Sequence, residues 1–250
     1  MVYSLPRTLL VLFCSLAFSC CDSDSPQRII DRSIGAHGGR KFEKIRIEFD
    51  FRGRHYSSTR DGGIFTYTRE FTDSTGSIKD VFTNNSFHRE RNGNRAIITD
   101  ERAKAFSNSV NSVIYFALLP YGLNDPAVRK FYVSESIIKN KVYHLIKVTF
   151  EEEGGGEDFE DVFLFWINAE NFRLDYFAYS YKSDGGGIRF REAINQRFVE
   201  DILFQDYNNF KPKSDTVTLE QMKELFESNG LEKMSVINLE NIKVIGLQTH

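Results

Sequence analysis

Alternation of apolar and polar residues with a period of two runs through most of this chain and restricts its fold more than any other feature. Residues 45–51 read IRIEFDF, and a similar alternation returns in residues 64–69. Such alternation places successive side chains on opposite faces of a strand and is typical of antiparallel sheets. Further strands are expected at Val81-Phe82, near Phe87, over residues 95–99, 130–138, 142–151, 160–168, 173–182, 187–195 and 198–207, and once or twice within residues 231–248.

Short turn sequences separate these strands. Asp61-Gly62-Gly63 and Asn92-Gly93-Asn94 are typical of tight turns, and glycine runs occupy residues 154–156 and 185–187. No helix follows either glycine run, so neither run resembles a phosphate-binding loop. Because hairpins rather than helices join successive strands, the pattern argues against a parallel α/β fold.

Helical periodicity is confined to three segments. Residues 26–37 begin with Ser25 and Pro26, an N-cap and a first-turn proline, and end before Gly38-Gly39. Residues 101–118 lack glycine and proline and carry an apolar stripe. Residues 218–228 begin with the capping-box residues Thr218 and Gln221.

We therefore predict a mainly β (α+β) fold: a large curled antiparallel sheet or half-open barrel of about 10–11 strands, with about three helices packed on or inside it. The segment Phe163-Leu164-Phe165-Trp166-Ile167 is apolar at every position, so it predicts a strand that is buried on both faces. That arrangement fits a sheet wrapped around a helix.

The N-terminal segment has the pattern of a lipoprotein signal peptide. Residues 9–19 are apolar or small, which is too short to cross a hydrocarbon core, and Ala17 and Ser19 precede Cys20. We predict a signal peptide over residues 1–19, an acylated Cys20 and tether over residues 20–25, and a single β-rich domain over residues 26–250. Cleavage without acylation, and acylation of Cys21, remain open alternatives.

Composition narrows the classes of function. All three cysteines precede residue 22, so the rest of the chain can form no disulfide or thiol site. The net charge of −3 gives no electrostatic reason to expect a nucleic-acid partner. The histidines are scattered and the acidic residues around 151–161 lack a calcium-loop spacing, so we expect no metal and no cofactor.

Polar residues within apolar segments are the candidate ligand-cavity residues. Such groups must be hydrogen-bonded or lie at a cavity mouth, and aromatic side chains commonly line apolar pockets. The candidates are Asn111, Tyr115, Tyr121, Asn124, Asp125, Trp166, Asp175, Tyr179, Arg189 and Arg191. The sequence contains no recognised catalytic motif; an enzyme would need an acid–base pair such as Asp175 with His144.

Several motifs together carry a family resemblance. The chain resembles an uncharacterised family of Bacteroidota lipoproteins over about residues 26–245. The motifs that carry the resemblance are SVNSVIYFALLPYGLNDPAV, EEEGGGEDFEDVFLFWIN, FRLDYFAYSY and GGIRFREAINQR. That family supplies no catalytic residue. The order of strands and helices also resembles the lipoprotein-sorting proteins LolA and LolB, half-open barrels whose apolar cavity holds acyl chains; no residue motif of those proteins is present.

We therefore expect a non-enzymatic outer-membrane lipoprotein, on the periplasmic face or the cell surface, that binds a lipid or another apolar or amphipathic ligand. Its membrane attachment would rest on N-terminal acyl chains. The observations behind this expectation are the predicted anchor, the antiparallel pattern and the many aromatic residues. An enzyme acting on an envelope or nutrient small molecule, and a structural or interaction module of the outer membrane, remain the alternatives.

Overall fold

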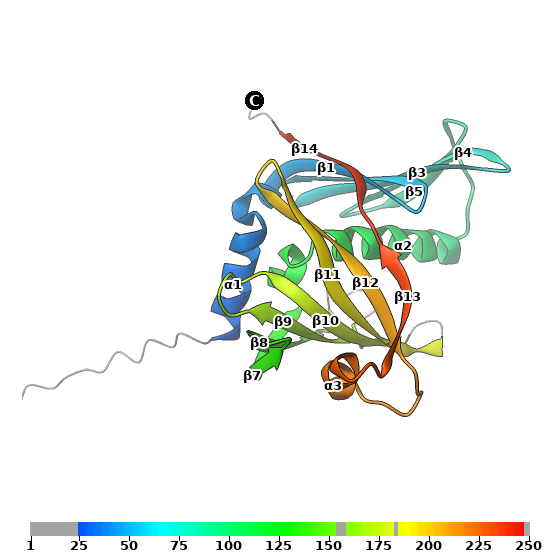
Figure 1. The fold of residues 1–250 in the computed structure, drawn as a ribbon. Coiled ribbons are helices and arrows are strands. Elements are labelled where there is room, and N and C mark those ends of the chain that lie inside the picture. Colours follow the sequence, from blue (N-terminus) through cyan, green and yellow to red (C-terminus); the bar gives the residue numbers. More distant parts are fainter. Residues whose placement is uncertain (1–24, 154–158, 183–184, 248–250) are drawn as a thin grey trace, which may run out of the picture.

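Fourteen strands form two seven-stranded antiparallel sheets in the computed structural model, which describes residues 25–153, 159–182 and 185–247 (Figure 1). The sheets do not close into a barrel, and the mainly β fold with helices packed on curled sheets is confirmed. The strand count exceeds the predicted 10–11. The predicted signal peptide, Cys20 and the glycine run 154–156 lie outside the described residues. None of the described helices is long and apolar enough to cross a membrane.

Sheet A has the strand order β14-β1-β2-β3-β4-β5-β6. Its strands are β1 (Lys44–Phe51), β2 (Arg54–Asp61), β3 (Ile64–Asp73), β4 (Gly76–Thr83), β5 (Phe87–Arg91), β6 (Asn94–Arg95) and β14 (Glu240–Gly246). The sequence pattern did not indicate β2, which carries few apolar residues. Instead, its buried Ser57 and the facing Thr68 of β3 share a hydrogen bond of 2.7 Å between their hydroxyls, which satisfies both polar groups within the sheet.

Sheet B has the order β13-β12-β11-β10-β9-β8-β7. Its strands are β7 (Val128–Ile138), β8 (Lys141–Phe150), β9 (Val162–Asn168), β10 (Leu174–Tyr181), β11 (Gly187–Val199), β12 (Ile202–Pro212) and β13 (Leu231–Ile237). The predicted break between residues 195 and 198 was wrong. A bulge with Asn195 at a φ of 50° occurs there, and β11 continues to the turn at Glu200-Asp201.

A short link joins the sheets at one edge, because β13 of sheet B leads directly into β14 of sheet A (Figure 1). Leu239 lies in this link, and its backbone N–H donates to the Asp206 carboxylate over 2.9 Å. The Arg197 guanidinium donates to the Leu239 carbonyl over 2.6 Å and to Asp206 over 3.1 Å. These bonds hold the link against β12 and fix the edge at which one sheet passes into the other.

The three predicted helices are present, with small changes at their ends. They are α1 (Pro26–His37), α2 (Asp100–Ala117) and α3 (Met222–Glu227). Three-residue to five-residue 3₁₀ helices precede or follow them: η1 (Gly39–Glu43), η2 (Tyr121–Asn124) and η4 (Leu219–Gln221). Ser25 caps α1, and the capping box of Thr218 with Gln221 is confirmed at the start of η4.

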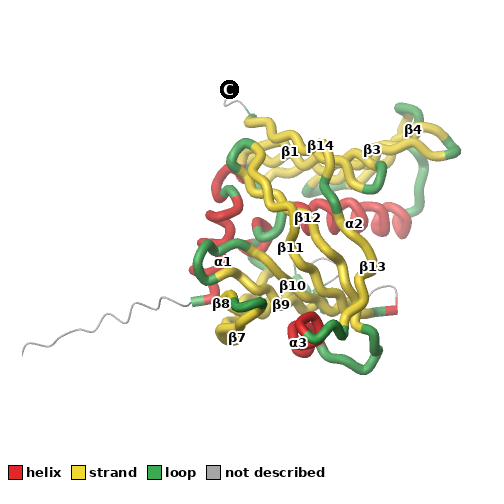
Figure 2. The backbone as a smooth tube through the Cα atoms, viewed as in Figure 1, coloured by secondary structure: helices red, strands yellow, loops and turns green. Residues whose placement is uncertain are grey.

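Helix α2 lies between the two sheets (Figure 2). Its Val110 and Ile114 are buried with the apolar face of sheet A, while Phe116 packs against Phe163 and Phe177 of sheet B. Helix α1 covers the same face of sheet B, and α3 covers the opposite face. The middle of β9 is therefore buried on both faces, as its uninterrupted apolar sequence predicted.

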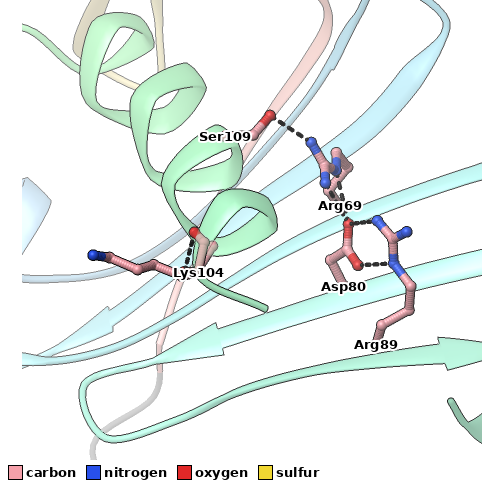
Figure 3. Close-up of polar contacts among 6 residues, drawn as sticks. Arg69, Asp80, Arg89, Lys104 and Ser109 are labelled. Atoms are coloured by element: carbon pink, nitrogen blue, oxygen red, sulfur yellow. Dashed lines mark hydrogen bonds and ion pairs between the residues drawn. The ribbon is translucent and has the colours of Figure 1, made fainter. Parts of the chain in front are cut away.

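A buried ion-pair cluster holds α2 on sheet A (Figure 3). Asp80 of β4 is fully buried and receives hydrogen bonds from Arg69 of β3, at 2.6 and 2.9 Å, and from Arg89 of β5, also at 2.6 and 2.9 Å. Both arginines also contact α2: Arg69 donates to the Ser109 hydroxyl over 2.8 Å, and Arg89 lies 3.5 Å from the Phe106 ring centroid. One carboxylate thus orients two cations toward the helix.

Replacing Asp80 with Ala should lower the free energy of unfolding by about 3–5 kcal/mol, because two largely buried guanidinium groups would lose their carboxylate. Urea unfolding followed by circular dichroism measures this loss. The matched control is Glu70→Ala, which removes a half-exposed carboxylate that pairs with Lys79 over 2.9 Å; a change of about 0–1 kcal/mol is expected there. Equal losses in the two variants would contradict this role of Asp80.

Candidate functional site

Helix α2 separates two cavities that open on its opposite sides. We call them the Arg191 cavity and the Arg60 cavity. The Arg191 cavity, of about 200 Å³, is lined by Phe51, Arg52, Ser112, Val113, Phe116, Ala117, Arg191, Gln205, Tyr207, Asn209, Ile237 and Leu239. The Arg60 cavity, of about 420 Å³, is lined by Arg60, Gly63, Phe65, Tyr67, Asn84, Asn111, Ile114, Tyr115, Leu118, Tyr121, Gly122, Asp125, Ala127, Val128 and Phe150.

The Arg191 cavity lies between α2, the strands β11 and β12, and the link between the sheets. The α2 side is small or apolar, with Val113 and Ala117 facing the space. The β12 side is polar, because Gln205, Tyr207 and Asn209 follow at intervals of two residues and so share one strand face. The phenol of Tyr207 is fully buried, and burial raises its pKa to about 12. This cavity therefore has one apolar wall and one wall of neutral and cationic polar groups.

The Arg60 cavity lies between α2, the strands β2 and β3 of sheet A, and the segment that follows α2. The Arg60 guanidinium donates to the Tyr67 hydroxyl and lies 4.9 Å from the centroid of the Tyr121 ring. Burial raises the pKa of the Asp125 carboxyl, although the nearby positive charges of Arg60 and Lys130 act in the opposite direction. This cavity thus combines a cation, a partly desolvated carboxyl and aromatic rings.

Buried polar atoms without hydrogen-bond partners occur in the walls of both cavities. In the Arg191 cavity they are Nε of Arg191 and Oδ1 of Asn209. In the Arg60 cavity they are Nε of Arg60 and the hydroxyl of Tyr115. Since buried polar groups in folded proteins are nearly always paired, such atoms point to a missing partner, either water or a bound molecule.

Five of the ten candidate residues from the sequence line these cavities. Asn111, Tyr115, Tyr121 and Asp125 line the Arg60 cavity, and Arg191 lines the other. Tyr179 lies next to the Arg191 cavity, since its hydroxyl accepts a hydrogen bond of 3.0 Å from Arg191.

The remaining four candidates lie elsewhere. Asn124 donates to Asp31 of α1 over 2.7 Å, and Trp166 lies in the core beneath α3, where its indole N–H donates to Ser136. Arg189 donates to the carbonyl of Ile188 and lies over the Tyr181 ring. Asp175 accepts hydrogen bonds from Tyr143, Asn168 and Gln196.

An acid–base pair of Asp175 with His144 does not form. Asp175 bonds to Tyr143, whose ring belongs to the core on the α3 side of sheet B. His144 is the next residue on β8 and its ring stacks on Phe172, which belongs to the core on the α1 side. Adjacent residues of a strand point to opposite faces, so this version of the enzyme hypothesis fails.

Sequence reasoning missed Arg60 and the polar wall of β12. Arg60 lies in a polar strand that the alternation did not reveal. The Gln205, Tyr207 and Asn209 side chains share a strand face and belong to a continuous polar run, residues 205–209, that follows the apolar residues 202–204. A polar run inside a predicted strand was a signal that could have identified them.

The comparisons agree with this architecture. Residues 7–239 match the profile of DUF6503, a family of unknown function. The chain belongs to this family. The DUF6503 chain matches no curated protein. Its uncharacterised family was predicted from the sequence motifs, and the LolA-like architecture is confirmed as well.

Among solved structures, this DUF6503 protein is similar to a LolA superfamily protein from Nitrosomonas europaea, with a TM-score of 0.50 and 10% identity over 90% of this chain and 96% of that one. A DUF1329 family protein from Desulfovibrio piger gives a TM-score of 0.49 and 11% identity, over 88% and 93% of the two chains. At these identities the first likeness shows a shared fold and nothing further.

Replacing Tyr115 with Phe should leave the ligand-free protein as stable as before, or more stable by up to about 1 kcal/mol, because the variant removes a buried hydroxyl that has no partner. Tyr67→Phe is the control. It removes a hydroxyl that accepts from Arg60, so a loss of about 1–2 kcal/mol is expected. Urea unfolding measures both. A loss in Tyr115→Phe as large as in the control would mean that the hydroxyl has a partner.

Proposed function

We propose that this protein is a lipid-anchored envelope protein that binds an apolar or amphipathic ligand beside helix α2, without catalysis. The observation that carries the proposal is the pair of cavities, each with buried polar atoms that lack a partner in its wall. An amphipathic molecule would place its apolar part on the aliphatic and aromatic walls and its polar part on these atoms.

The size of the cavities suits this proposal. A cavity of 150 Å³ with apolar walls can hold benzene, and pockets for small molecules commonly reach 300–1,000 Å³. The Arg60 cavity, at about 420 Å³, lies within that range, and the Arg191 cavity, at about 200 Å³, exceeds the benzene-sized case. Both could hold a molecule, or a part of one, that is larger than a few waters.

The solved structures add support at the level of the fold. The protein from Nitrosomonas europaea belongs to the LolA superfamily, and the resemblance stated above implies a half-open barrel that holds acyl chains. The position of α2 inside the curled sheets, with space on both of its sides, agrees with such a role. Acylation at Cys20 would keep the binding domain close to a membrane, which is the source of the expected ligand.

A role as an interaction module is the second candidate. Within the described chain, β7 is an edge strand of sheet B, and its Phe131, Val133 and Ile137 have exposed fractions of 52%, 50% and 59%. Exposed apolar side chains on a strand edge favour contact with another chain. Such a contact would not use the cavities beside α2, so binding measurements on cavity variants distinguish the two functions.

Filling the Arg191 cavity should reduce ligand binding. Ala117→Phe places a ring in this space, so we expect an apolar fluorescent probe such as N-phenylnaphthylamine to bind at least about tenfold more weakly, a change of about 1.4 kcal/mol. Fluorescence titration of the purified protein measures the affinity, and native mass spectrometry of protein taken from membranes identifies any lipid that copurifies.

The matched control is Ala105→Phe, which adds the same ring to an exposed position on the same helix, outside both cavities. It should bind the probe as the wild type does. Absence of probe binding and of copurified lipid in the wild type would refute the proposed function, and equal affinities in all three proteins would place binding outside the Arg191 cavity.

Acylation is tested separately by metabolic labelling with a palmitate analogue. Cys20→Ala should lose the label and leave the signal peptide uncleaved, whereas Cys21→Ala should keep the label, because Ala17 and Ser19 place small residues before Cys20. A label that depends on Cys21 would move the anchor by one residue. A processed protein without any label would indicate an ordinary signal peptide.

A further inference from the structure

Arg191 is a buried cation without an anionic partner. It lies in the middle of β11, between Phe177 of β10 and Asn209 of β12, and its exposed fraction is 8%. One guanidinium nitrogen donates to the Tyr179 hydroxyl over 3.0 Å, and the buried Nε has no partner. In the part of the chain that the structure describes, no carboxylate forms an ion pair with it.

The other buried arginine among the described residues, Arg69, does have a carboxylate partner. Arg69, with an exposed fraction of 2%, has two hydrogen bonds to Asp80 and one to Ser109. Burying a charge is costly unless it is paired and hydrogen-bonded. Phe116, Phe177 and Tyr179 surround the Arg191 guanidinium, with its central carbon 5.4–5.9 Å from their ring centroids, and they offset part of that cost. The charge itself remains uncompensated within the described chain.

The uncompensated cation lines a cavity that otherwise suits an apolar group. Much of the wall of the Arg191 cavity is apolar and is formed by Val113, Phe116, Ala117 and Leu239. A cation at the wall and apolar side chains around the remaining space match a molecule with an anionic head and a hydrocarbon tail. Arginine is well suited to such a head group, because its planar donors match an oxyanion.

We infer that the Arg191 cavity binds a carboxylate-bearing amphiphile with a short tail, such as a medium-chain fatty acid, with the carboxylate on Arg191. This inference rests on the proposed function and names the ligand class of one of its two cavities. The cavity wall contains two arginines, of which Arg52 is exposed to solvent and Arg191 is buried. A carboxylate carries a single charge that the buried Arg191 balances, whereas a phosphate monoester carries about −1.5 to −2 and would leave excess negative charge beside Arg191. A volume of about 200 Å³ favours a tail of medium length over a long acyl chain.

The test is isothermal titration of the purified protein with octanoate, octan-1-ol and octyl phosphate. The wild type should bind octanoate at least about tenfold more tightly than octan-1-ol, since a hydrogen-bonded charge pair is lost with the alcohol. Arg191→Met should abolish this preference while octan-1-ol still binds, and Arg191→Lys should keep part of it. Replacement of a buried charge by an apolar side chain of similar volume is commonly tolerated, so the Met variant should fold.

Arg189→Gln is the control. It removes the cation of Arg189, which lies two residues from Arg191 on the same strand but lines neither cavity. The affinity for octanoate should therefore not change. Octanoate binding that is equal in the wild type and Arg191→Met, or no tighter than that of octan-1-ol, would overturn the inference, and tighter binding of octyl phosphate would overturn the carboxylate assignment. Each of these results leaves the proposed function intact if the apolar probe binds, whereas absence of all binding refutes both.

Discussion

Helix α2 lies between two sheets that do not close into a barrel, and its side chains supply apolar surface to both. An antiparallel sheet must cover one face, and here a single helix contributes to the cover of two sheets. Val110 and Ile114 are buried against sheet A, while Phe116 stacks with Phe177 of sheet B. Each buried side chain of this size contributes about 1.5–3 kcal/mol. The position of the two cavities follows from this packing, because α2 supplies wall residues to both of them.

One helix cannot fill the space between two curved sheets, because its width is only about 10–12 Å with side chains. Space therefore remains on both of its sides, as the Arg191 cavity and the Arg60 cavity. The two buried arginines of the described chain differ in their hydrogen-bond partners. Arg69 is paired with Asp80, which it shares with Arg89, and helps to hold the helix, whereas Arg191 faces a cavity with a tyrosine hydroxyl as its hydrogen-bond partner. The first arrangement serves stability, and the second is the kind expected at a binding site.

Membership of DUF6503 gives this protein relatives without a known activity, and the likeness to a LolA superfamily structure gives it a fold. Neither fact names a ligand. The features that favour binding are local: cavities beside α2, walls that are partly apolar, and polar atoms in those walls that lack partners. The two cavities differ in charge, because the wall of the Arg60 cavity contains the Asp125 carboxyl and the wall of the Arg191 cavity contains no carboxyl group. The two sides of α2 could therefore bind different ligands.

Local rules were sufficient for much of the secondary structure. The period of two and the turn residues predicted most strands. The caps of residues 26–37 and 218–228 and the apolar stripe of residues 101–118 predicted the three helices, because each signal depends on neighbours in the sequence. The exceptions have local causes as well. Strand β2 is polar and its Ser57 is satisfied by Thr68 across the sheet, and Asn195 forms a bulge that resembled a strand end.

The sequence by itself determined the mainly β class, the helices and the separation of an N-terminal cysteine-containing segment from a cysteine-free remainder. It also indicated Arg191 as a candidate, together with Arg189, because the two arginines share one face of a predicted strand. Tertiary structure alone decided that Arg69 has a carboxylate and Arg191 has none, and that Tyr115 and Asp125 share a cavity while Asp175 and His144 lie on opposite faces. The physical reason is that contacts across a sheet depend on strand register, and burial depends on which face a helix or the other sheet covers. The folded structure sets both, even though most neighbouring strands here are consecutive in the sequence.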